Sequence, residues 1–337
     1  MKTVRIKDVA ARAQVSVATI TRVVNGSGYV SEATRERVQR AIDELGYIPN
    51  RMASALKSKQ TGIIGNILPS IEVNPFFTSL TAAIGRHAGQ YGYQIMSMVT
   101  SFDKDVEGSL IDDLIGRMAE GIFFIGETLT APAKIEQLVR GGIPVVMLER
   151  PLALPGIDKV TVNAFEGSAF AAARFARAGH HDVAYIGVRL RHTIESDRYE
   201  GFRVTLQAHG VRLTPARTVF VDEYTTQHGY DAMRALLDGP GPHPTAVFVA
   251  SDILACGALQ CLYDARLRVP DDVSVIGYDN TLAASATPAI SSVAMPVEDI
   301  AKAAMDLFRE QKAGERQVGK SVALSPFYVD RGTVREG

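Results

Sequence analysis

The stretch VRIKDVAARAQVSVATITRVVNGSGYVSEATRERVQRAIDEL (residues 4–45) decides how the start of this 337-residue chain folds. Ser16 and Ser31 are good helix N-caps, and Gly46 is a good helix end. Apolar residues recur at helical spacing in three successive segments, namely 6–13, 16–24 and 31–45. The pattern predicts a three-helix head that begins with a helix-turn-helix.

From residue 61 the pattern changes to short apolar runs that alternate with helical segments. One series of such runs ends with PVVMLER (144–150) and a second with VSVIGYD (273–279). Alternation of this kind predicts parallel sheets built from βαβ units and buried on both faces. We therefore expect an α/β fold in which the helix-turn-helix head precedes a two-lobed body of doubly wound parallel sheets. Ligands of such folds bind beyond the carboxyl ends of the strands, which places a ligand site between the lobes.

The expected boundaries divide the chain into a head, a linker and two lobes, in keeping with its length. They are 1–48 for the head, 49–60 for a hinge helix or linker, 61–161 plus 294–334 for the N-terminal lobe, and 162–293 for the C-terminal lobe.

The two parts of the chain differ in net charge. Residues 1–60 contain 11 basic and 5 acidic residues, whereas the other 277 residues contain 25 basic and 32 acidic ones. A basic head on an acidic body favours a polyanion as the partner of the head. A solvated basic surface is the alternative interpretation of the charge alone.

Composition argues against a membrane-spanning protein, a secreted protein and a zinc or disulfide site. Apolar residues make up 46% of the chain, yet no run of 18 of them occurs and the N-terminus lacks the apolar core of a signal peptide. The two cysteines, Cys256 and Cys261, lie five residues apart on different faces of a predicted helix, which fits neither a disulfide nor a zinc site. We expect a cytoplasmic protein without a membrane partner.

The second helix of a helix-turn-helix lies in the major groove of DNA. There Arg22 can donate to O6 and N7 of a guanine, and Val17 and Ala18 can contact a thymine methyl group. A plain three-helix bundle is the alternative interpretation of the pattern. The residues of this segment that we expect to contact DNA are Ser16, Val17, Ala18, Thr19, Thr21, Arg22 and Asn25.

Residues 4–65 resemble the head and hinge of the lactose-repressor (LacI) family of transcriptional regulators. Further phrases typical of the family follow in the body, including RYEGF (198–202), TAVFVASDILACGAL (245–259) and LRVPDDVSVIGYDN (267–280). The resemblance implies a transcriptional regulator, most often a repressor, that is controlled by a small effector such as a sugar or sugar derivative. It implies no enzymatic activity.

The resemblance also implies a hinge helix over residues 50–58 that forms on the operator. Asn50, Ala53 and Leu56 match its DNA contacts, with Leu56 as the apolar wedge that opens a central CG-type step in the minor groove. A free nine-residue helix is marginal in water, so this one would need its partner and DNA. Gln14 departs from the family pattern, which usually has glycine in the turn, and we expect strain or a shifted turn there.

The effector site implied by the resemblance centres on Arg198 and Asp279. A guanidinium and a carboxylate facing one cleft can fix vicinal hydroxyls or a ligand carboxylate, and aromatic rings can stack on the ligand. The expected effector-binding residues are Asn74, Phe76, Phe77, Glu149, Arg150, Asn163, Arg198, Tyr224, Asp252 and Asp279. For each of them a capping or surface role is the alternative.

Two tempting motifs predict no site. GERQVGKS (314–321) fits the P-loop pattern, but a P-loop follows a strand and opens a helix, whereas this segment precedes a strand-like run. The pair His180 and His181 lies at a helix-to-strand turn, where we expect a structural role. We expect no cofactor, no metal site and no catalytic residue.

The expected partners are palindromic double-stranded operator DNA, a carbohydrate-related effector and a second copy of the chain. A two-fold dimer reads a palindrome, and the chain ends at Gly337 without the leucine heptads that would predict a tetramer. The alternatives are a sugar receptor related to periplasmic binding proteins and, more weakly, an α/β enzyme with a nucleotide site. Salt-dependent DNA binding would distinguish the regulator from both.

Overall fold

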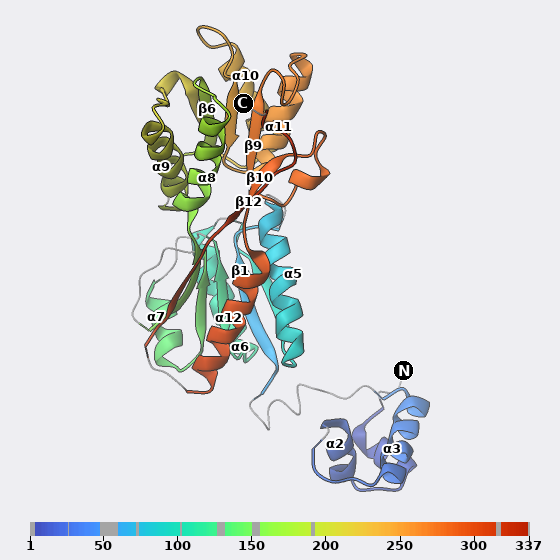
Figure 1. The fold of residues 1–337 in the computed structure, drawn as a ribbon. Helices are drawn as coiled ribbons and strands as arrows, with labels where there is room; N and C mark the ends of the chain where they lie inside the picture. The colour runs from blue at the N-terminus through green and yellow to red at the C-terminus, as the bar shows by residue number, and fades with distance from the viewer. Residues whose placement is uncertain are drawn as a thin grey trace. The chain divides into compact units, whose positions relative to one another are not determined.

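The computed structural model describes residues 4–25, 27–47, 60–71, 74–101, 103–126, 132–149, 156–189, 193–314 and 318–335. The chain divides into two compact units, Met1–Thr61 and Gly62–Gly337, which we call the head and the body. Figure 1 shows the helices of the head and the helices and strands of the body.

The head contains the three predicted helices around a small apolar core. Val9, Ile20 and Val38, one from each helix, are fully buried in it. Gly46 follows the third helix in the left-handed conformation, with φ 61°. The helices are α1 (Ile6–Ala13), α2 (Val17–Asn25) and α3 (Glu32–Leu45).

Gln14 lies at the turn of the helix-turn-helix in a left-handed conformation, with φ 53° and ψ 47°. Its N–H donates to the carbonyl of Ala11 at 3.3 Å, and the next amide, of Val15, donates to Ala10 at 3.1 Å. A left-handed conformation costs a residue with a side chain roughly 1–2 kcal/mol, which glycine avoids. The expected strain at Gln14 is therefore confirmed.

The N-terminal lobe of the body holds a six-stranded sheet in the order β11-β5-β4-β3-β1-β2, in which every pairing is parallel. Strands β3 and β4 are buried along their whole length, as predicted for strands covered on both faces. The strands are β1 (Ile63–Leu68), β2 (Gln94–Val99), β3 (Ile122–Ile125), β4 (Val145–Leu148), β5 (Asp158–Val162) and β11 (Ser321–Leu324).

Two pairs of helices cover this sheet. Helices α5 and α12 pack against each other and against one face, as Figure 1 shows, and α6 and α7 cover the other. Asn74 caps α5 by accepting a hydrogen bond from Phe76 N at 2.9 Å. The helices are α5 (Pro75–Gln90), α6 (Lys104–Gly116), α7 (Pro132–Arg140) and α12 (Val297–Lys312).

The C-terminal lobe holds a second six-stranded sheet in the order β12-β10-β9-β8-β6-β7. All pairings are parallel except that of β12 with β10, which is antiparallel. The strands are β6 (Val183–Val188), β7 (Thr218–Val221), β8 (Ala246–Val249), β9 (Ser274–Asp279), β10 (Ser291–Ala294) and β12 (Phe327–Val329).

Helices α8 and α9 cover one face of this sheet, and α10 and α11 the other. Each pair is in close backbone contact at a glycine. A Cβ on Gly201 of α9 would lie 2.2 Å from the carbonyl oxygen of Phe165, and one on Gly257 of α11 would lie 1.9 Å from that of Thr226. The helices are α8 (Ala164–Arg177), α9 (Thr193–Ala208), α10 (Thr226–Leu237) and α11 (Asp252–Asp264).

The expected α/β fold class is confirmed, but one part of the expected division of the body is wrong. Helix α12 and strand β11 belong to the N-terminal lobe as expected, whereas β12 pairs with β10 in the other sheet. Residues 327–334 therefore belong to the C-terminal lobe, and the C-terminal segment returns to it (dark red in Figure 1). The reason is the free edge of β10, whose unpaired backbone groups β12 satisfies. The chain thus crosses between the lobes after β5, after β10 and after β11.

Candidate functional site

A buried ion pair lies at the carboxyl end of β9. Arg198 of α9 donates through Nη2 to Asp279 Oδ1 at 3.4 Å and through Nη1 to the carbonyl of Ala250 at 2.8 Å. Its Cζ atom lies 3.9 Å from the ring centroid of Tyr278, where the aromatic face stabilises the cation. Arg198 Nε is buried and has no partner in the described part of the chain. A buried donor of this kind needs a hydrogen-bond partner beyond the described residues.

The other oxygen of Asp279 connects the two lobes. Asn74 Nδ2, at the start of α5 in the N-terminal lobe, donates to Asp279 Oδ2 at 3.4 Å, and Ser251 Oγ donates to the same oxygen at 3.1 Å. The rings of Phe76 and Phe77 follow in the first turn of α5, with centroids 5.8 Å apart in an edge-to-face arrangement. Phe76 is buried and Phe77 half-buried. Asn74, Arg198 and Asp279, all predicted from the sequence, thus lie together.

Glu149 lies at the end of β4 and belongs to the same electrostatic environment. Its Oε1 accepts a hydrogen bond from Val162 N at 2.6 Å, at a crossing between the lobes. Burial raises the pKa of Glu149 to about 7, an effect that this hydrogen bond and Arg198 oppose and that Asp279 reinforces. Glu149 and Asp279 both have positive φ angles, 52° and 94°. Backbone strain of this kind is typical of functional sites.

Glu195 is a site residue that the sequence did not predict. Tyr224 follows β7, and its hydroxyl donates to Glu195 Oε1 at 3.2 Å. Glu195 Oε2 is buried without a partner among the described residues. Glu195 precedes Arg198 by three residues on α9, a spacing that places the two side chains next to each other. That spacing could have identified it. We call Asn74, Glu149, Glu195, Arg198, Tyr224 and Asp279 the Arg198 cluster.

Two predicted effector residues, Asp252 and Asn163, have hydrogen-bond partners within the chain. Asp252 is fully buried, and its Oδ2 accepts from the amides of Thr281 at 2.8 Å and Ala283 at 3.2 Å while Oδ1 accepts from Ser292 Oγ at 2.7 Å. Burial raises the pKa of Asp252 to about 6 against these hydrogen bonds. Asn163 is exposed and caps α8 by accepting from Glu166 N at 3.1 Å. Both positions favour the capping or structural alternative.

The predicted DNA-contacting face of the head is exposed to solvent. Ser16 Oγ accepts from Thr19 N at 3.1 Å, which makes Ser16 the cap of α2. Thr21 Oγ1 donates to the carbonyl of Val17 at 3.0 Å. Arg22 is exposed and lies beside Gly28, where an added Cβ would be 3.6 Å from Arg22 Cδ. Ala18 is also exposed. The side chain of this face most able to read a base is thus directed away from the core of the head.

Several predicted residues lie outside the described part of the chain. They are Asn50, Ala53 and Leu56 of the hinge, Arg150 of the effector site, and the side chain of Asn25. Their roles remain predictions.

The motifs set aside in the sequence have structural explanations. Ser321 opens strand β11, so GERQVGKS precedes a strand, and Lys320 Nζ lies 3.7 Å from Glu310 Oε1. His180 is buried between Thr245 Oγ1 and Ser274 Oγ, each 2.9 Å from a ring nitrogen, and burial lowers its pKa to about 4. Among the described residues no group of side chains could hold a metal ion. No helix in the same residues is long and apolar enough to cross a membrane.

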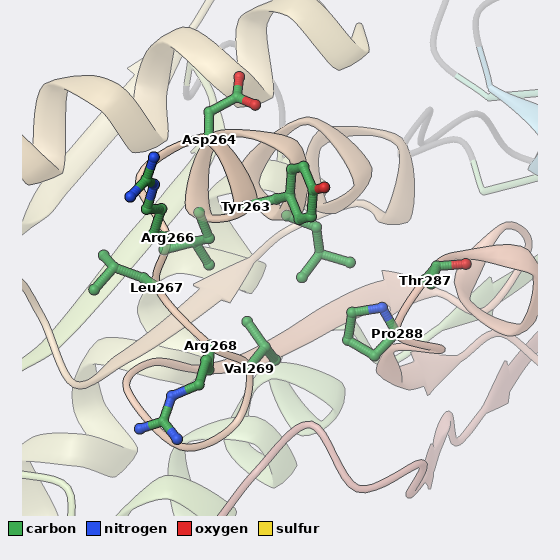
Figure 2. Close-up of a pocket in the computed structure, with 10 residues that line it drawn as sticks. Tyr263, Asp264, Arg266, Leu267, Arg268, Val269, Thr287 and Pro288 are labelled. Atoms are coloured by element: carbon green, nitrogen blue, oxygen red, sulfur yellow. The ribbon is translucent and has the colours of Figure 1, made fainter.

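A separate groove lies on the C-terminal lobe at the end of α11 (Figure 2). Its volume is about 660 Å³, and it is lined by the apolar side chains of Leu267, Val269 and Pro288 and by the charged side chains of Asp264, Arg266 and Arg268. Tyr263 lies beside them with 81% of its surface exposed. The groove contains none of the predicted DNA-binding or effector-binding residues.

Comparison with known proteins identifies both units. Residues 5–50 match the model of the bacterial regulatory proteins of the lacI family, and residues 172–334 match a periplasmic binding protein-like domain. The HTH-type transcriptional regulator DegA of Bacillus subtilis is 32% identical, with 98% of each chain covered.

Two solved structures are similar over the whole chain. A complex of the transcriptional regulator CelR with cellobiose is 29% identical, with a TM-score of 0.72 and 98% of this chain and 99% of that chain covered. The Lac repressor dimer bound to operator and the anti-inducer ONPF is 25% identical, with a TM-score of 0.84 and the same coverage. On the evidence of the head, the two-lobed body and these relatives, the chain belongs to the lacI family of bacterial transcriptional regulators.

Proposed function

We propose that this protein is a repressor that binds palindromic operator DNA as a dimer and responds to a small molecule bound at the Arg198 cluster. The observation that carries the proposal is the buried Arg198 guanidinium, whose Nε has no partner in the described chain, beside an Asp279 carboxylate that also bonds Asn74 of the other lobe. A ligand that supplies the missing acceptor would contact both lobes. The ligand would thereby stabilise one arrangement of the two lobes over others. Such a shift is the requirement for coupling to DNA binding.

The charge of the cluster favours a neutral or cationic effector. Three carboxyl groups, those of Glu149, Glu195 and Asp279, surround one guanidinium, and burial raises the pKa of Glu149 to about 7 and that of Asp279 above its ordinary value. A sugar acid or sugar phosphate would add further negative charge to a buried site, which is costly. Hydroxyl groups can donate to the carboxylates and accept from Arg198 Nε. We infer a neutral sugar or an amino sugar, a class to which the cellobiose bound by the relative CelR also belongs.

The DNA-binding part of the proposal is tested by selecting duplexes from a random-sequence pool with the full-length protein. We expect a palindromic sequence to be enriched and its affinity to fall steeply with salt, about 10³-fold or more between 50 and 200 mM if the dimer contacts six or more phosphates. Arg22→Met should relax the preference at one position of each half-site while the head stays folded, because Arg22 is exposed. Enrichment of no sequence would refute the operator-binding proposal.

The effector is tested by thermal shift with matched ligands. Cellobiose, glucose and glucosamine form one group, and gluconate and glucose 6-phosphate the other. A ligand of the first group should raise the unfolding temperature of the wild-type body and leave that of Asp279→Asn unchanged. Stabilisation by the acids alone would refute the inferred charge of the effector.

The dimer requires a self-complementary surface, and we infer that it uses the groove at the end of α11. An exposed tyrosine beside apolar side chains is typical of a protein interface. A two-fold dimer would place the same surface of both copies in contact. The Lac repressor relative, a dimer on its operator, supports a dimeric assembly.

A further inference from the structure

The first residue of the body is held by a buried carboxylate. Gly62 N donates to Glu120 Oε1 at 2.6 Å, and in return Glu120 N donates to the carbonyl of Ile63 at 2.8 Å. The carbonyl of Gly62 accepts from Gln94 N at 2.7 Å. Gly62 has a φ of 68°, and a Cβ at this position would lie 3.2 Å from the carbonyl oxygen of Gly92, so the position favours glycine. The chain therefore enters the body at one fixed point.

Lys312, the last residue of α12, neutralises the same carboxylate. Its Nζ forms an ion pair with Glu120 Oε2, and the Glu120 side chain is 8% exposed. The ammonium also lies 5.0 Å from the ring centroid of Tyr93 and 5.9 Å from that of Phe308. Because the Glu120 carboxylate is almost fully buried, leaving it without Lys312 would be costly, although the Lys312 side chain is 32% exposed. Glu120 thus joins the entry of the chain to the end of one helix.

The other end of α12 lies next to the Arg198 cluster. The helix follows β10, whose last residue Ala294 pairs with Asp279 in the sheet register. Met295 N donates weakly to the carbonyl of Asp279 at 3.5 Å, and α12 begins two residues later at Val297. Sixteen helical residues span about 24 Å. A single helix therefore connects the backbone of the effector site with the carboxylate that holds Gly62.

Near Gly62, the C-terminal turn of α12 is also bonded to the sheet. Gln311 Oε1 accepts from Val145 N at 3.1 Å, and Gln311 Nε2 donates to Asp158 Oδ2 at 2.7 Å. Asp158 Oδ1 in turn accepts from Lys320 N at 2.7 Å. The end of α12 therefore cannot move without displacing strands β4, β5 and β11, and movement of the helix would be transmitted to Glu120.

We propose that Glu120 and Lys312 are positioning residues for operator binding, because together they fix where the chain leaves the body relative to α12. Operator recognition by a dimer requires two heads at a defined separation. Each head is joined to its body at Gly62, the first residue of the body. Loosening this point lowers specific affinity, because the bound arrangement then costs more ordering entropy. The same contact lies on the route by which effector-site movements reach the head. The inference rests on the proposed DNA-binding function.

The test measures affinity for the duplex that the wild-type full-length protein selects from the random pool and, separately, for a scrambled duplex of the same length. Glu120→Gln and Lys312→Met should each weaken binding to the selected duplex about tenfold and leave binding to the scrambled duplex unchanged. Lys312→Arg keeps the charge and should stay within about twofold of wild type. Amide exchange in the peptide that contains Gly62 should accelerate in Glu120→Gln and Lys312→Met.

Glu298→Gln is the matched control. It removes a carboxylate from the first turn of the same helix, where Glu298 pairs with Arg86 on the surface, and it should leave both DNA affinities unchanged. A lower unfolding temperature in Glu120→Gln and Lys312→Met without a change in the ratio of the two DNA affinities would overturn the inference, since a merely structural pair predicts that result. If Glu120→Gln does not fold, Lys312→Met decides alone. Failure of the wild-type protein to select any duplex would instead refute the proposed function.

Discussion

Glu149 makes the stability of the body depend on pH. Burial is the largest cause of its raised pKa, which is about 7 in the folded protein against an ordinary value of 4.5. Between these values the folded state binds more protons than the unfolded state, so stability falls as pH rises through this window. Below pH 4.5 both states are protonated and the effect is absent. Above pH 7 the full effect remains, and 2.5 pKa units correspond to about 3 kcal/mol.

Replacing Glu149 with glutamine should remove this dependence. The amide oxygen can still accept the hydrogen bond from Val162 N, and no charge is buried. We expect Glu149→Gln to be more stable than wild type at pH 8, by up to about 3 kcal/mol, and equal to it near pH 4.5. Urea unfolding of both proteins across this range measures the difference. A constant difference at every pH would show that the pKa of Glu149 is the same in the folded and unfolded states.

Gln14 offers a stabilising substitution in the head. Its left-handed backbone costs roughly 1–2 kcal/mol with a side chain present, and Gln14→Gly removes that cost while increasing the entropy of the unfolded chain by somewhat less. We expect a net gain of about 0.5–1 kcal/mol. Amide exchange of buried positions in α1 and α3 should slow accordingly. Faster exchange would mean that the glutamine side chain makes a compensating contact.

At this scale the sequence predicts the charged centre of the site better than its surroundings. Arg198 and Asp279 lie in contact as expected, because sequence motifs point to both residues and Asp279 also ends a strand. Asp252 also follows a strand, yet the loop at 281–283 occupies its carboxylate, and no local pattern indicates which strand-end carboxylate a loop will cover. The prediction of pocket residues relied on the ends of strands. It therefore missed Glu195, which lies in the first turn of helix α9.

Helix pairs in the C-terminal lobe depend on three glycines, namely Gly201, Gly229 and Gly257. At Gly257 of α11 a Cβ would lie 1.9 Å from the carbonyl oxygen of Thr226, a backbone atom of the neighbouring helix that has no freedom to withdraw. We expect Gly257→Ala to destabilise the body by about 3 kcal/mol or more, in the range of severe overpacking. Thermal unfolding measures it.

Gly85 of α5 is the control for this substitution. Apart from its chain neighbours and the backbone of its own helix, no described atom lies within 4 Å of the position that a Cβ would take. Gly85→Ala should therefore gain about 0.5–1 kcal/mol from helix propensity. A similar loss in both variants would contradict the explanation from helix contact.

The order of elements was predictable where periodicity is strong, and β12 shows where it fails. A three-residue strand carries too little pattern to indicate its partner, and its antiparallel pairing with β10 depends on a free sheet edge formed by distant residues. Chain order alone places it with β11. Assignment of short terminal strands to a lobe therefore requires the tertiary structure.

For the whole molecule, the body has the larger task in the proposed mechanism, since it must bind the effector and hold two heads together. The head carries six net positive charges and the body seven net negative ones, so only the head attracts DNA over long distances. A monomer presents one half-site reader. Dimer formation through the α11 groove therefore converts weak half-site binding into operator binding, with the gain set by the effective concentration of the second head.

Tyr263→Asp tests this assembly. The substitution introduces a carboxylate beside the apolar side chains of Leu267 and Pro288, and burial of that charge at a dimer interface would be costly. Because Tyr263 is 81% exposed in the single chain, the variant should fold with an unchanged unfolding temperature at low protein concentration. Sedimentation should show a monomer where wild type is a dimer, and affinity for the selected palindrome should fall at least about 10²-fold. Val318→Asp, at a position 78% exposed outside the groove, should remain dimeric and bind DNA normally. A dimeric Tyr263→Asp would move the interface to another surface of the body.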